Sequence, residues 1–112
     1  MNNFVHEGNV IEVSAPYEVT GGDGVLRGNL FGIAASWARE GEPVAISTAG
    51  VFDLPRDPRH DWAVGEAIYW DDGSRCFTRD AQGAVKVGIA VAPTHGTGHP
   101  WVRGKLLGFA ID

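Results

Sequence analysis

The sequence has little cysteine, little lysine and no long apolar run. Cys76 is the only cysteine among 112 residues, which excludes an intramolecular disulfide and every metal or redox motif that needs two cysteines. No apolar run approaches the ~18–20 residues that cross a bilayer, and residues 1–7 lack the basic and apolar regions of a secretory signal. We therefore expect a soluble protein that is made in the cytoplasm and has no membrane partner.

Positive charge is also scarce. Nine lysine and arginine residues stand against fourteen acidic residues, which gives a formal net charge of −5, and the basic residues are spread along the chain. Nucleic-acid binding draws most of its affinity from clustered basic side chains that displace counterions. The sequence therefore predicts that nucleic acid is not a partner.

Glycine, in contrast, is abundant, and its sixteen residues divide the chain into short segments rich in Val, Ile and aromatic residues. This pattern is typical of short strands joined by tight turns, with a two-residue hairpin turn at Gly28-Asn29. Residues 34–40 favour either a single helical turn or extended structure. We predict an all-β fold, a small barrel or sandwich of about seven to nine short strands with Gly-rich turns. The strands are expected at residues 10–15, 25–27, 30–34, 44–48, 51–54, 67–70, 85–91 and 101–107.

The chain length suits one domain, which we place at residues 9–112, preceded by an N-terminal arm of residues 1–8. The arm carries Phe4 and Val5 among polar residues and is too short to fold by itself. These two side chains either need a partner surface on another protein or begin the first strand and cover the end of the domain. The sequence leaves both interpretations open.

Motifs for catalysis and metal binding are weak. His95 and His99 are four residues apart, but the glycines between them and the following proline exclude a helix that would place both on one face. The charged loop at residues 53–61, with His60, could hold acid–base groups beside Trp62 but is typical of an exposed loop. No P-loop or nucleophile elbow is present. We predict no enzyme, no metal and no cofactor, with a small metal-binding enzyme using these histidines as the alternative.

Four tryptophans are many for so short a chain. Stacking on single-stranded nucleic acid normally needs a basic groove as well, and the composition does not provide one. We expect two tryptophans in the core and others at protein–protein contacts, because tryptophan buries much area at low entropic cost. Trp62 and Trp101 are the candidates for such contacts, and Cys76 is expected to be a small packed residue.

Several segments, in this order, are similar to one known family. They are NFVHEGNVI (3–11), SAP (14–16), GDGVL (22–26), LFGIA (30–34), GVFDLP (50–55), WAVGEAIYWD (62–71) and VGIAV (87–91). On these segments the chain resembles phage capsid-cement, or head decoration, proteins, a family also labelled as a RecA/RadA-like recombinase. The recombinase label gains no support, because the sequence has no P-loop. The end of the chain, residues 104–112, is longer than the usual finish of the family.

The resemblance implies a non-enzymatic structural protein of the virion that binds the outer surface of a phage capsid and stabilises it. The implied partners are the major capsid protein and further copies of the chain, with a homotrimer favoured over a dimer. We expect the contacts with the capsid or with other subunits at Asn3, Phe4, Val5, Trp62 and Trp101. A tail or neck adaptor is the alternative among virion proteins.

Overall fold

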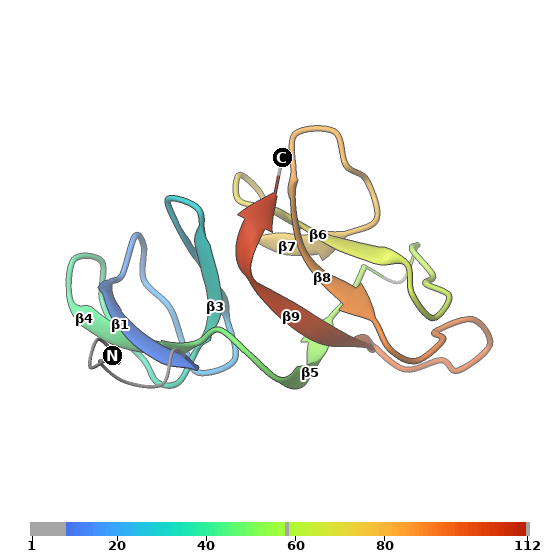
Figure 1. Ribbon diagram of the computed structural model, residues 1–112, viewed down its shortest axis with the longest axis horizontal. Helices are drawn as coiled ribbons and strands as arrows, with labels where there is room; N and C mark the ends of the chain where they lie inside the picture. The colour runs from blue at the N-terminus through green and yellow to red at the C-terminus, as the bar shows by residue number, and fades with distance from the viewer. Residues whose placement is uncertain (1–8, 58, 112) are drawn as a thin grey trace, which may run out of the picture.

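The computed structural model describes residues 9–57 and 59–111, and these residues form nine strands and no helix (Figure 1). The all-β prediction is therefore confirmed. All ladders between the strands are antiparallel, and the strands join into one sheet that is not a closed barrel. The described residues contain no helix long and apolar enough to cross a membrane. The strands are β1 (Val10–Ser14), β2 (Gly24–Arg27), β3 (Leu30–Ala34), β4 (Pro43–Ser47), β5 (Val51–Pro55), β6 (Ala67–Asp71), β7 (Cys76–Thr78), β8 (Val85–Ala90) and β9 (Trp101–Ile111).

The N-terminal half, residues 9–48, contains β1 to β4. Strand β4 pairs along its whole length with β1 and at its end with β3, and β3 also pairs with β2. The β2–β3 hairpin turns at Gly28-Asn29 as expected, and Gly28 has a φ of 63°, which a residue without Cβ adopts at little cost. Residues 34–40 are not helical, and Ala38 forms an isolated antiparallel bridge with Val19.

The C-terminal half, residues 51–111, contains β5 to β9 in the order β5-β9-β8-β6-β7. Register shifts lie between Ile68 and Tyr69 and between residues 86 and 88, and such bulges bend a sheet. The curvature brings the two outer strands close enough for one parallel bridge between Arg56 and Phe77. Strand β9 continues to Ile111, beyond the expected end at residue 107, and reaches the N-terminal half at the Leu30–Phe109 pair.

The two halves share an aromatic cluster at their junction. Phe31 of β3 packs against Trp70 of β6 and Phe77 of β7, with ring centroids 5.5 and 6.0 Å away, and the latter two rings are 4.9 Å apart. All three side chains are buried. A Cβ on Gly24 would lie 2.8 Å from the Trp70 ring, so the backbone of β2 approaches the cluster closely. The pairing of β3 with β9, which lie side by side in Figure 1, and the packing of these rings therefore join the halves into one body.

Candidate functional site

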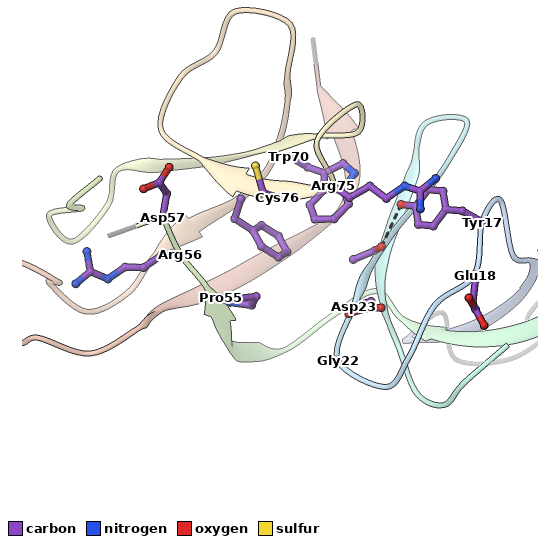
Figure 2. Close-up of a pocket in the computed structure, with 12 residues that line it drawn as sticks. Tyr17, Glu18, Gly22, Asp23, Pro55, Arg56, Asp57, Trp70, Arg75 and Cys76 are labelled. Carbon is purple, nitrogen blue, oxygen red and sulfur yellow. Dashed lines mark hydrogen bonds between the residues drawn. The ribbon is translucent and has the colours of Figure 1, made fainter. Parts of the chain in front are cut away.

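A groove of about 500 Å³ lies between the two halves (Figure 2). The N-terminal half lines it with the segment that leads into β2, and the C-terminal half lines it with residues of β5, β6 and β7. Most of the lining is apolar, with Trp70 and Phe77 beside the ring of Pro55. The charged lining residues are Glu18, Asp23, Arg56, Asp57 and Arg75.

A polar network crosses the junction beside this groove. The Tyr17 hydroxyl lies 3.1 Å from the Gly24 carbonyl oxygen and 3.1 Å from Asp72 Oδ1, and the Trp70 indole N–H donates to the same Asp72 oxygen at 2.9 Å. Burial of the phenol, together with the negative charge of Asp72, raises the pKa of Tyr17 to about 12. The hydroxyl therefore keeps its proton at neutral pH and donates within the junction.

Arg75 lines the groove in a strained backbone conformation. Its φ of 54° lies in the left-handed region, and among the described residues it is the one non-glycine residue with positive φ. The guanidinium carbon is 3.9 Å from the centroid of the Tyr17 ring, a cation–π contact between the two halves. Backbone strain tends to occur where a side chain has a required position, so Arg75 marks the groove as a candidate site.

An exposed tryptophan lies next to the groove. The Trp37 indole N–H donates to Glu18 Oε2 at 3.2 Å, and the Arg39 guanidinium is 5.4 Å from the Trp37 ring. The Trp37 side chain is 52% exposed. Trp37 was not among the contact residues expected from the sequence, although its polar neighbours in sequence, Ser36 and Arg39, indicate exposure.

The expected contact residues have different positions in the structure. Asn3, Phe4 and Val5 lie outside the described residues. Trp62 is 1% exposed and its indole N–H donates to the Ala67 carbonyl oxygen at 3.0 Å, so it belongs to the core of the subunit and is not available at its surface. Within the loop at residues 60–66, whose other residues are exposed or half-buried, the Trp62 side chain alone turns into the core, and its backbone N–H donates to the Thr94 hydroxyl at 2.7 Å.

Trp101, in contrast, is half-buried at the surface. Its ring stacks on His99 with centroids 4.5 Å apart and planes 11° apart. The stacked pair borders a second depression of about 330 Å³, which Pro93, Thr97 and Arg103 also line. Trp101 therefore remains a candidate for contact with another protein.

The histidine loops make structural contacts. His95 Nδ1 lies 3.5 Å from Asp61 Oδ2, and Asp61 also accepts from Arg56 and from Thr94, each at 3.1 Å. Hydrogen bonding from Thr94 and His95, with the nearby Arg56 charge, lowers the pKa of the Asp61 carboxyl. Within residues 9–57 and 59–111, no group of three or more histidine, cysteine and acidic side chains is placed to hold a metal.

Cys76 is exposed at the groove, so the expectation of a packed residue is wrong. The neighbouring Phe77 of β7 points into the core, and successive side chains of a strand point to opposite faces, so Cys76 points outward. Partial burial of the thiol and the nearby Asp71 carboxylate raise the pKa of Cys76, which keeps it protonated at neutral pH.

Comparison with known proteins gives one match. The family model described as phage cement protein matches residues 5–106, nearly the whole chain. No curated protein and no solved structure matches the chain. The matched segment ends within β9, so residues 107–112 extend beyond it, in line with the longer end noted in the sequence.

Proposed function

Since the chain belongs to the phage cement protein family, we propose that it binds the outer surface of a phage capsid and stabilises the shell as a homo-oligomer. A structural, capsid-associated role follows from the family itself. The binding surface and the oligomer are the parts that we propose. The observation that carries the proposal is the family match over residues 5–106, which includes the second half of the arm, from Val5 onward.

Such a protein acts through interface energy and needs no bond chemistry. Its partners are the major capsid protein and other copies of the chain, as a trimer in preference to a dimer. Several weak contacts held together in one oligomer give an affinity that a single subunit does not reach. Nucleic acid and membranes are not among the proposed partners, because the net charge of −5 repels phosphate groups.

We place the contacts on the arm and on exposed tryptophans. The arm contributes Asn3, Phe4 and Val5, and the folded part contributes Trp101. We add Trp37, because its side chain is exposed and its indole bonds Glu18 at the edge of the groove. Tryptophan is enriched among the few interface residues that provide most of the binding energy. Trp62 is left out because its side chain is enclosed in the subunit.

Binding to purified capsids that lack the protein tests this proposal, with cosedimentation as the measurement. Phe4→Ala, Trp37→Ala and Trp101→Ala should each weaken binding by on the order of tenfold, because anchor residues carry most of the energy of an interface. Val64→Ala is the matched control, since Val64 is 62% exposed and lies outside the proposed contacts. Unchanged binding by all three variants would rule out these contacts. Failure of the unaltered chain to bind capsids would rule out the function.

The oligomer is tested separately by the mass in solution. Multi-angle light scattering of the purified protein should give three times the mass of one chain, 11.9 kDa. A mass of two chains would select the dimer, and a single chain at all concentrations would contradict oligomer formation before capsid binding.

A further inference from the structure

The groove between the halves lies at the same end of the sheet as the beginning of β1. Val10 pairs with Ser47, Ser47 with Ile33, and Ile33 with Gly24, so these four residues form one row across four strands. Gly24 lines the groove. Three spacings between strands of roughly 4.8 Å put the two ends of the row about 14 Å apart. The chain before Val10 therefore starts close to the groove.

The length of that chain matches the distance. Asn9 is held by the Thr48 backbone N–H, which donates to its carbonyl oxygen at 2.8 Å. The five residues from Asn9 back to Phe4 reach about 17 Å when extended, at roughly 3.3 Å per residue. Phe4 can thus arrive at the groove without any change in β1.

The groove and the segment also match in chemistry. Phe4 and Val5 are the apolar residues that follow the first three positions, and the groove offers the apolar surface beside Pro55 and Phe77. From reach and apolar match we infer that this groove is the docking site of the chain's own residues 1–8.

Tethering makes the chain's own segment the favoured occupant. A short tether gives the segment an effective concentration in the millimolar range, well above that of a second copy in dilute solution. The groove then shields Phe4 and Val5 until a partner binds. The inference goes beyond the proposed function and does not rest on it, because the contact is made within one chain and is tested without capsids.

Cys76 provides a probe, since it lines the groove and is the only cysteine of the chain. In Phe4→Cys the two thiols should form a disulfide within the chain when diamide is added as the oxidant. A disulfide needs Cα atoms roughly 4.4–6.8 Å apart, so its formation reports direct proximity. The product is a monomer that migrates faster in non-reducing electrophoresis. Val10→Cys is the matched control: it carries a thiol at the far end of the row and should not react with Cys76.

A second measurement uses the native thiol without an added cysteine. Modification of Cys76 by a maleimide should be about tenfold faster in the double variant Phe4→Ser, Val5→Ser than in the unaltered chain, because a docked apolar segment covers the groove. Phe109→Ser removes an exposed aromatic residue outside the groove lining and should leave the rate unchanged. Near-ultraviolet circular dichroism of each variant verifies that faster modification does not come from unfolding.

The disulfide and the rate of modification together distinguish three outcomes. A disulfide within the chain and a faster reaction in the double variant support the inference. A disulfide between two chains would show that the segment docks on a second copy and would overturn docking within the chain. Absence of any disulfide, with equal rates of modification, would overturn the groove as a site for this segment. Capsid binding enters none of these measurements, so the proposed function can fail or hold independently.

Discussion

The two halves of the molecule bury different kinds of side chain. The N-terminal half is built mainly on aliphatic residues, whereas the C-terminal half encloses Trp62, Trp70 and Phe77. The two buried aromatic residues of the N-terminal half, Tyr17 and Phe31, both face the other half. Its own core consists chiefly of Val19, Val25, Ile33, Val44 and Ile46.

This difference indicates that the N-terminal half depends on its neighbour. Small aliphatic side chains on four short strands bury limited apolar area, and a small sheet needs a further layer for stability. The C-terminal half provides that layer through Trp70 and Phe77, beside the Leu30–Phe109 backbone pairing. The two halves should therefore unfold together, and the variants below test the junction from the largest expected effect to the smallest.

Phe31→Ala should have the largest effect. The side chain is fully buried against two aromatic rings of the other half, and its removal leaves a cavity at the junction. We expect a loss of about 3–5 kcal/mol in the free energy of unfolding, measured by urea denaturation. Phe109→Ala, at a 54% exposed position, should change it by no more than about 0.5 kcal/mol. Two separate unfolding transitions in the unaltered chain would refute the dependence of one half on the other.

Gly24→Ala should have the next largest effect. The new methyl would lie 2.8 and 2.9 Å from two Trp70 ring atoms, so β2 or the ring must move, and overpacking of this kind costs about 1–3 kcal/mol. Gly21→Ala is the matched control, because the nearest atom to its methyl would be 3.5 Å away. Thermal melts of both variants decide the matter. Equal melting temperatures would mean that the two halves can move apart enough to admit the methyl group at no cost in stability.

Tyr17→Phe removes the hydroxyl that lies between Gly24 and Asp72 and should cost about 0.5–1.5 kcal/mol at neutral pH. The pKa of Tyr17 is raised from 10.0 to about 12 in the folded protein, so folding favours the protonated phenol. Its contribution is complete below pH 10 and is lost as the pH rises towards 12. The difference in stability between the unaltered chain and Tyr17→Phe should therefore shrink over this range. A difference independent of pH would contradict a titrating role for Tyr17.

Substitutions of Arg75 should have the smallest effect on stability, and the size of that effect should depend on the new residue. Arg75→Ala loses the cation–π contact with Tyr17 and keeps the left-handed backbone, at a cost of about 0.5–1 kcal/mol. Arg75→Gly loses the same contact but relieves the backbone, because glycine adopts positive φ readily. Chemical denaturation should rank Arg75→Gly as more stable than Arg75→Ala. The opposite order would show that the backbone at position 75 carries no strain.

The local parts of the fold were predictable. The hairpin at Gly28-Asn29 needs only a turn residue that tolerates positive φ between two apolar runs, and the sequence displays both. The C-terminal strand was expected to end at residue 107 but continues to Ile111, because pairing with Lys86 and Leu30 supports its last residues. Strand β7 was not expected, since its three residues are too few to show alternation.

The candidate site was predictable only in part. The groove combines residues far apart in the chain, such as Tyr17 and Arg75, and no local sequence motif predicts it. The positions of the tryptophans were likewise hidden: Trp62 is enclosed, while Trp37 lies exposed beside Glu18. Which aromatic residue faces solvent depends on which segments pack over it.

By itself, the sequence determined the all-β class, the family and the positions of most strands, because glycine turns and apolar runs act on neighbouring residues. Only the tertiary structure decided that Phe31 would pack against Trp70 and Phe77 and that a groove would remain beside them. Those contacts arise from pairing between distant strands, and the burial of each side chain follows from the pairing rather than from its own residue type.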